Sequence, residues 1–273
     1  QLSTLKISPQ IAVFLNIFPE HLDYYCDFAD YIKAKTNIMK YQKSTDVLIY
    51  NGENKKVAAI AKSATAEVFD YSKIKINIGT NEIKLKGEHN LSNIKAVFQV
   101  GRVLKIDDAI ISQAVTGFSP LRHRLEFVGK FNGVNFYNDS LATIPEATIS
   151  ALDALGDEVA TLITGGYDRG LSYAELAKRI LQSRIKYLIL FPTTGETIRN
   201  EMVKISDQKS IGIKHELVDS MEKAVALSFK NTKKGKICLL SCASSSFNLF
   251  KDYRDRGDRF VKEVVEKTGK PGL

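Results

Sequence analysis

Residues 118–148 read FSPLRHRLEFVGKFNGVNFYNDSLATIPEAT, and they separate two parts of the chain that differ in character. Ser119-Pro120 ends a helical pattern, because the residue before a proline is pushed out of the helical region. Asn132-Gly133 lies between two runs rich in β-forming residues, and this dipeptide predicts a two-residue hairpin turn. We therefore place a domain boundary near Ser119-Pro120, between residues 1–119 and residues 120–273.

The same stretch carries charges on both sides of the predicted hairpin. Arg122, His123 and Arg124 precede it, and Asn138-Asp139-Ser140 closes it. The planar guanidinium group matches the geometry of phosphate oxygens. A carboxylate can accept hydrogen bonds from ribose hydroxyls. These residues therefore predict a polyphosphate site at the boundary, and a charged linker is the alternative.

The C-terminal part alternates apolar strands with helices. Strands are expected at 159–164, 187–191, 213–217 and 236–241, and helices at 145–155, 196–203, 220–230 and 247–267. Ser172 and Glu175 have the spacing of a capping box, which predicts the start of another helix. This alternation predicts a parallel sheet of Rossmann-like architecture.

The N-terminal part also reads as α/β. Strands are expected at 11–17 and 46–50, with weaker strand signals at 67–71 and 74–78, and helices at 23–41, 87–104 and 107–117. The overall class predicted for the chain is therefore α/β.

Composition restricts the class of protein. The 273 residues carry a net charge of +8 and include three cysteines without a CxxC pair, which fits a reducing cytoplasm. No apolar run approaches the length of a transmembrane helix. The basic charge leaves nucleic-acid binding as an alternative, although the lysines are scattered. Because the chain opens at Gln1 without a methionine, we expect it to be a piece of something larger.

Two pairs in the N-terminal part are candidate ligand contacts. Asn90 and Asn93 lie three residues apart at a predicted helix start, and carboxamides can read the edge of adenine; helix capping by Asn90 is the alternative. His21 follows a strand, where ligands of α/β sheets gather, and a solvated loop histidine is the alternative. Lys35 is an ordinary exposed cation unless something converts it into a metal ligand.

Two segments of the C-terminal part follow strands. Gly165–Gly170, with sequence GGYDRG, lacks the full GxGxxG spacing and predicts a tight turn that holds Arg169 over the sheet edge. Ser241–Asn248, with sequence SCASSSFN, runs into a predicted helix, whose N-terminus could bind an anion; a serine-rich cap is the alternative. The chain contains no GxxxxGK[ST], GxSxG or HExxH motif.

Seven elements in this order resemble the Mur ligases. They are NxxxEHLDYY at 16–25, the lysine at 35, GEHNLSN at 87–93, LRHRLE at 121–126, NDSLAT at 138–143, GGYDRG at 165–170 and SSSFNLFKDYRDRGDRF at 244–260. The last element is the most specific, and it is most similar to the members that add D-glutamate to UDP-N-acetylmuramoyl-L-alanine in peptidoglycan synthesis.

The resemblance implies a domain organisation and a reaction. Residues 1–119 would be the C-terminal part of the central ATP-binding domain, and residues 120–273 the C-terminal Rossmann-like domain. ATP would activate the substrate carboxylate as an acyl phosphate with Mg²⁺ bound, and the amine of D-glutamate would attack it. A cytoplasmic monomer without nucleic-acid or membrane partners is expected.

The resemblance also implies roles for individual residues. Metal binding would involve His21 and a carbamylated Lys35, which are the expected catalytic residues. ATP contacts would come from Asn90, Asn93, Arg124 and Asp139, and contacts to D-glutamate from Arg169, Ser246, Phe247 and Tyr253.

The chain departs from the family pattern at several points. It has no P-loop, no uridine-binding domain and no metal-binding glutamate before Gln1. Leu141 and Arg169 stand where lysines are usual. Since phosphoryl transfer depends on metal and P-loop groups, we expect little or no ligase activity from the chain alone. The alternatives are a sister amide ligase, such as a folylpolyglutamate synthetase or a Mur ligase of another step, and a non-catalytic nucleotide-binding or nucleic-acid-binding module.

Overall fold

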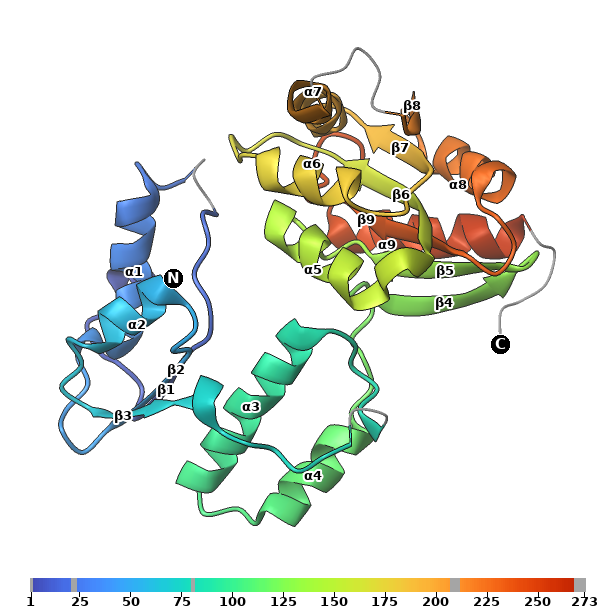
Figure 1. Cartoon of the computed structure of the whole chain (residues 1–273). Helices are drawn as coiled ribbons and strands as arrows, with labels where there is room; N and C mark the ends of the chain where they lie inside the picture. Colours follow the sequence, from blue (N-terminus) through green and yellow to red (C-terminus); the bar gives the residue numbers. More distant parts are fainter. Residues whose placement is uncertain (1, 21–23, 80–81, 207–211, 268–273) are drawn as a thin grey trace. The chain divides into compact units, whose positions relative to one another are not determined.

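The computed structural model describes residues 2–20, 24–79, 82–206 and 212–267. The chain forms two compact units, Gln1–Ser119 and Pro120–Leu273 (Figure 1). Both consist of strands alternating with helices, so the predicted α/β class is confirmed.

The N-terminal unit contains a parallel sheet of three strands. These are β1 (Ile11–Phe14), β2 (Val47–Tyr50) and β3 (Glu67–Asp70), in that order across the sheet. Helices α1 (Phe28–Lys40) and α2 (Lys55–Ala61) connect them. The side chains of Asp27 and Asn54 cap these helices by accepting hydrogen bonds from Asp30 N and Val57 N. Helix α1 therefore begins at Phe28 and not near residue 23.

Two further helices, α3 (Glu88–Val103) and α4 (Asp108–Gly117), follow in this unit and share a hydrophobic cluster. The strand expected at 74–78 is absent from the structure. Its alternating isoleucines are half-buried and pack against Ile83, Ile94, Phe98, Ile111 and Val115. The alternation thus reflects side-chain packing on the helices and not pairing with another strand.

The C-terminal unit is built on a sheet of six strands in the order β4-β5-β9-β6-β7-β8. The strands are β4 (Glu126–Phe131), β5 (Val134–Asp139), β6 (Val159–Gly165), β7 (Tyr187–Phe191), β8 (Lys214–Leu217) and β9 (Ile237–Ser241). Strands β4 and β5 form the predicted antiparallel hairpin, and all other neighbours are parallel. Asn132 and Gly133 both have positive φ angles, as a type I′ turn requires.

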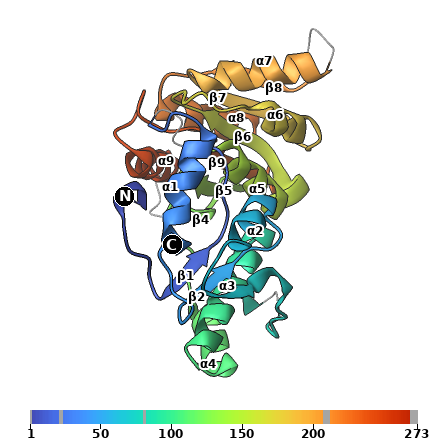
Figure 2. The ribbon, with the colours of Figure 1, turned by 90° about the vertical axis from the view of Figure 1, so that its left-hand side faces the viewer.

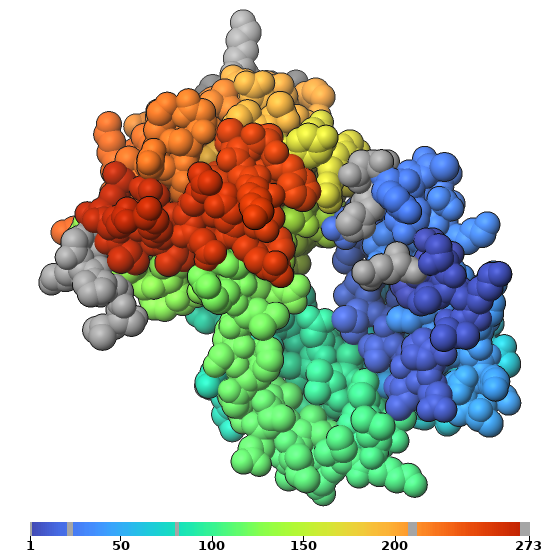
Figure 3. Space-filling view, turned by 180° about the vertical axis from the view of Figure 1, so that it is seen from behind, coloured from blue at the N-terminus to red at the C-terminus, as the bar shows by residue number. Residues whose placement is uncertain are grey.

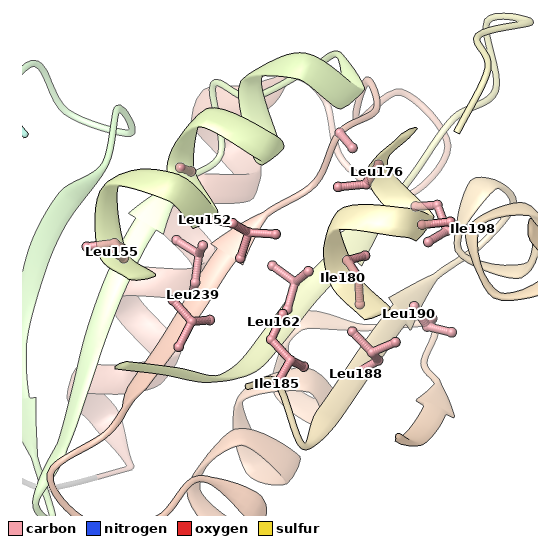
Figure 4. Close-up of a cluster of buried hydrophobic side chains, with 14 of the residues drawn as sticks. Leu152, Leu155, Leu162, Leu176, Ile180, Ile185, Leu188, Leu190, Ile198 and Leu239 are labelled. Carbon is pink, nitrogen blue, oxygen red and sulfur yellow. The ribbon is translucent and has the colours of Figure 1, made fainter. Parts of the chain in front are cut away.

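Helices cover both faces of this sheet. One face carries α5 (Pro145–Leu155), α6 (Ala174–Leu181) and α7 (Thr194–Ser206), and the other carries α8 (Met221–Asn231) and α9 (Tyr253–Glu266). Figure 2 shows α9 and α5 on opposite sides of the strands. In Figure 3 the orange and red side chains of α8 and α9 cover their face. Leucines from β6, β7 and β9 lie under α5 and α6 (Figure 4).

Two helix starts in this unit differ from the expectation. Helix α6 begins at Ala174, so Tyr173 and not Ser172 is its N-cap, and no side chain makes a capping hydrogen bond from that position. Helix α9 begins at Tyr253, because the Asp252 side chain caps it by accepting from Asp255 N. The serine-rich segment after β9 is therefore an irregular loop, and the prediction that it runs directly into a helix N-terminus was wrong.

Candidate functional site

Strands β5, β9 and β6 are parallel neighbours and end together, at what we call the carboxyl edge of the six-stranded sheet. Asp139 pairs in register with Ser241. Ile163 pairs with Leu240, so Thr164 lies one step further, beside Ser241. Three polar residues thus form a row where apolar strands end. Ligands of open α/β sheets bind at such an edge.

Asp139 is held by hydrogen bonds on both carboxyl oxygens. The residue is 7% exposed. Oδ1 accepts from Leu125 N at 3.0 Å, and Oδ2 accepts from Ser241 Oγ at 2.8 Å. Ser241 Oγ lies 2.9 Å from Thr148 Oγ1 of α5. The carboxyl group therefore connects the turn before β4, the end of β9 and helix α5.

Burial raises the pKa of Asp139 to about 7, because the charged form is poorly solvated in this position. The hydrogen bonds from Ser241 and Leu125 and the guanidinium groups of Arg124 and Arg256 lower this pKa, but they do not offset burial. The carboxyl group consequently changes charge near neutral pH.

The GGYDRG and SSSF segments lie against each other at this edge. Tyr167 N donates to Ser245 O at 2.9 Å, which forms an isolated β-bridge. The Arg169 guanidinium lies 5.8 Å from the centre of the Phe247 ring. Ser246 is 2% exposed and Phe247 is 60% exposed. The structure therefore brings Arg169 and Phe247 together, as candidate residues of one site.

A series of hydrogen-bonded hydroxyl groups connects the GGYDRG segment to the SSSF segment. Ser244 Oγ lies 2.8 Å from Tyr173 OH and 2.7 Å from Thr194 Oγ1, and Gly166 N donates to Thr194 Oγ1 at 2.9 Å. Gly166 has a φ of +156°, and a Cβ there would lie 2.3 Å from Ser245 O. Only glycine lets the two segments approach this closely.

Arg256 is a residue that the sequence analysis missed. It is the largest fully buried side chain of the described residues, and it contacts the loops after β5 and β9. Helix α9 looks polar, with arginines at 254, 256 and 259. However, Arg256 precedes Phe260 and Val264 by four and eight residues, so it shares their buried face. That spacing is the signal that could have identified it.

His123 is buried and does not face solvent with its two arginine neighbours. The residue is 5% exposed, and its Nδ1 lies 2.9 Å from Asn138 Nδ2. Arg122 pairs with Asp258 at 2.5 Å. Arg122 and Arg124 are both exposed, and Arg124 directly precedes Leu125, whose N–H donates to Asp139. Arg124 and Asp139 interact electrostatically, which supports their grouping in one site.

Tyr253 begins helix α9 at the same edge. It is half-buried, with its ring 6.3 Å from the His123 ring in an edge-to-face arrangement. Its backbone oxygen accepts from Ser140 Oγ at 2.8 Å. The site predicted for an amino acid and the loop that carries Asp139 are therefore in direct contact through Tyr253.

In the N-terminal unit, the two asparagines lie in the first turns of α3. Gly87 is the N-cap, so capping by Asn90 is excluded. Asn90 is buried, and its Nδ2 donates to Lys86 O at 2.7 Å. Asn93 is half-buried. Their role toward adenine stays a prediction.

Lys35 lies on α1 with its Nζ 5.2 Å from the centre of the Tyr31 ring. His21, its expected partner, lies outside the described residues. Among the residues that the structure describes, no group of three histidines, cysteines or carboxylates is arranged to hold a metal ion.

A cavity of about 630 Å³ lies beside α1, and it is lined by residues that include Asp30, Lys33, Asn37 and Lys40. At 100° per residue these positions lie on the face of the helix opposite Lys35. This cavity is therefore separate from the predicted lysine site. None of the described helices is long and apolar enough to span a membrane.

Family comparisons match both units. Residues 1–81 match the family described as Mur ligase middle domain, and residues 123–244 match Mur ligase, glutamate ligase domain. The UDP-N-acetylmuramoylalanine--D-glutamate ligase of Clostridium botulinum (strain 657 / Type Ba4) is 34% identical over 97% of this chain. The enzyme of the same name from Clostridium kluyveri is 37% identical over 97% of this chain. The chain spans 61% of the length of each of these two relatives.

Solved structures have the same fold at low sequence identity. A MurF structure from Acinetobacter baumannii has a TM-score of 0.71 and 16% identity, covering 95% of this chain and 60% of its own. The MurF ligase of Thermotoga maritima in complex with ADP has a TM-score of 0.67 and 18% identity, covering 95% and 63%. Folylpolyglutamate synthase of Mycobacterium tuberculosis, complexed with ADP and AMPPCP, has a TM-score of 0.66 and 13% identity, covering 98% and 66%.

Proposed function

The chain belongs to the Mur ligase family, and we propose that it works as part of an ATP-dependent ligase that joins D-glutamate to UDP-N-acetylmuramoyl-L-alanine. Relatives carrying that name are 34–37% identical along 97% of the chain. The observation in the structure that supports the proposal is the contact between Arg169 and Phe247 beside the buried Ser246. It places a cation, an exposed ring and a serine loop at one carboxyl edge.

In the proposed reaction, a carboxylate oxygen of UDP-N-acetylmuramoyl-L-alanine attacks the γ-phosphorus of ATP, and ADP leaves. The amine nitrogen of D-glutamate then attacks the acyl phosphate carbon. Inorganic phosphate departs, the nitrogen loses a proton and an amide bond remains. ATP supplies the activation, and the residues of this chain supply binding and orientation.

The carboxyl edge is suited to hold D-glutamate, which carries two carboxylates. The guanidinium of Arg169 can donate two parallel hydrogen bonds to one carboxylate. Its position over the Phe247 ring limits the directions in which the fork can point. Ser246 and Tyr253 lie in the adjoining loop and helix start, and we assign them to the remaining polar atoms of the amino acid.

ATP is assigned to Arg124 and Asp139 on the C-terminal unit and to Asn90 and Asn93 on the N-terminal unit. Arg124 is exposed and can reach a phosphate. Both oxygens of Asp139 already accept hydrogen bonds, so its main contribution is to hold the loop beside Arg124. The binding of Mg²⁺ is assigned to His21 and to Lys35 in its carbamylated form. We propose a cytoplasmic monomer.

The test is a phosphate-release assay with ATP, Mg²⁺, D-glutamate and UDP-N-acetylmuramoyl-L-alanine. The chain alone should show little or no release, and the chain joined to the preceding segment of the Clostridium kluyveri relative should show release that depends on D-glutamate. If the joined protein stays inactive with D-glutamate but accepts L-glutamate with a folate acceptor, the folylpolyglutamate alternative replaces the proposal.

A further inference from the structure

Arg256 is a buried cation whose hydrogen bonds go to neutral oxygen atoms. The side chain is fully buried, and burial lowers its pKa. Within the described part of the chain it forms no salt bridge. Cys242 and Asp139 act electrostatically in the opposite direction and raise this pKa, but they do not offset burial. Burial of a charged group without an opposite charge costs folding free energy. We therefore looked for a role of Arg256 in the hydrogen bonds that it makes.

Its three hydrogen bonds connect two loops at the carboxyl edge. Arg256 Nε donates to Ser140 Oγ at 2.9 Å and Nη2 donates to Ser140 O at 2.8 Å. Nη1 donates to Ser244 O at 3.1 Å. The first loop, by which we mean the last two residues of β5 and the turn after them (residues 138–141), carries Asp139. The second loop, residues 244–247, carries Ser246 and Phe247. A single planar group therefore sets the distance between them.

The contacts extend from Arg256 to the other segments of the edge. Ser140 Oγ, which accepts from Arg256, donates in turn to Tyr253 O. Ser244 Oγ contacts Tyr173 OH and Thr194 Oγ1. Thr194 Oγ1 then accepts from Gly166 N, at the start of the GGYDRG turn. The segments that carry the site residues of the C-terminal unit thus belong to one hydrogen-bonded network, with Arg256 at its centre.

We propose that Arg256 is a positioning residue that couples the 138–141 loop to the 244–247 loop. The proposal rests on the proposed function of this edge, because it takes the first loop as the nucleotide side and the second as the D-glutamate side. Ordering of one loop by its ligand holds the guanidinium in place, and the guanidinium then holds the other loop. Lysine cannot replace it, since an ammonium group lacks the planar fork that reaches both loops.

The test is hydrogen exchange, followed by mass spectrometry, on the full chain and on the variants Arg256→Lys, Arg256→Gln and Ser140→Ala. We expect amides of both loops to exchange about ten- to a hundredfold faster in each variant, as when a hydrogen bond to a charged group is lost. Strand β7 should keep its protection. Ser140→Ala is the mildest change, because it removes a single hydroxyl group. If the Arg256 variants do not fold, the exchange rate of the 244–247 amides in Ser140→Ala measures the coupling.

Val264→Ala is the matched control, because Val264 is buried on the same face of α9 and has no polar contact. In this variant, the amide exchange rates of the two loops relative to that of β7 should be the same as in the wild type. If Ser140→Ala leaves 244–247 at the wild-type rate, or Val264→Ala opens both loops equally, Arg256 does not couple them.

Calorimetric titration with D-glutamate separates this proposal from the proposed function. Coupling predicts that Arg256→Lys binds D-glutamate about tenfold more weakly than the wild type. A wild-type chain that binds no D-glutamate would refute the assigned ligand, and the exchange result would still decide the coupling.

Discussion

Asp139→Asn should make the C-terminal unit less sensitive to pH. The buried Asp139 carboxyl accepts hydrogen bonds from Leu125 N and Ser241 Oγ, and burial raises its pKa from 3.8 to about 7. The folded state therefore binds a proton that the unfolded state has already released between these pH values. Asparagine has nearly the same shape and does not titrate.

The size of the effect follows from this difference in pKa. A rise from 3.8 to about 7 is about three pH units, and at ~1.4 kcal/mol per unit the ceiling is ~4 kcal/mol. The stabilisation from protonated Asp139 is complete below pH 3.8 and is lost as the pH rises through about 7. The free energy of unfolding of the wild type should thus fall from pH 4 to pH 8, relative to that of the variant, by up to ~4 kcal/mol.

The assay is urea unfolding at pH 4, 6 and 8. Unfolding is monitored by hydrogen exchange of peptides from β6 and β9, because these strands report on the C-terminal unit. Asp157→Asn is the control, because Asp157 is an exposed carboxylate 3.8 Å from Arg184. If the unfolding free energies of the wild type and Asp139→Asn stay parallel over this pH range, the buried carboxyl does not titrate as argued.

Three further predictions concern packing and access. Gly257→Ala places a Cβ 2.3 Å from His123 Nδ1 and should cost ~1–3 kcal/mol of unfolding free energy in a denaturation experiment, and an unchanged midpoint would contradict the close approach. Leu239→Ala removes a fully buried side chain under α5 and should cost ~2–5 kcal/mol by the same measurement, whereas a loss below ~1 kcal/mol would place it outside the core. Cys26 is exposed, so a thiol reagent should modify it at once and the two buried cysteines only on unfolding; fast reaction of all three thiols would contradict the burial.

Much of the C-terminal unit could be predicted from local patterns. The hairpin is predicted because Asn132-Gly133 supplies the two positive φ angles that its turn requires. Apolar runs such as 187–191 and 236–241 indicate strands buried on both faces, which suits a parallel sheet. Arg169 and Phe247 are nearly eighty positions apart in the sequence, yet their side chains meet in the structure. Hydrophobic periodicity could not assign them to one site, whereas the resemblance of their motifs to the family did.

Other features depend on tertiary contacts that no short window contains. The alternation at 74–78 matched a strand, but its isoleucines pack on α3 and α4 and find no pairing partner. Ser172 and Glu175 had capping spacing, but Tyr173 between them is buried with its hydroxyl on Ser244, and α6 starts after it. The burial of Arg256 depends on two other segments of the chain. Ser140 lies 116 residues before it, and Ser244 lies 12 residues before it, ahead of helix α9.

The strand order has a consequence for synthesis of the protein on the ribosome. Strand β9 is made last, yet it lies in the middle of the sheet between β5 and β6. Until residues 237–241 leave the exit tunnel, β5 and β6 each present an unpaired apolar edge, and such edges attract other chains. We expect nascent chains that stall between β8 and β9 to require a chaperone, whereas addition of the last strand closes the sheet in a single late step.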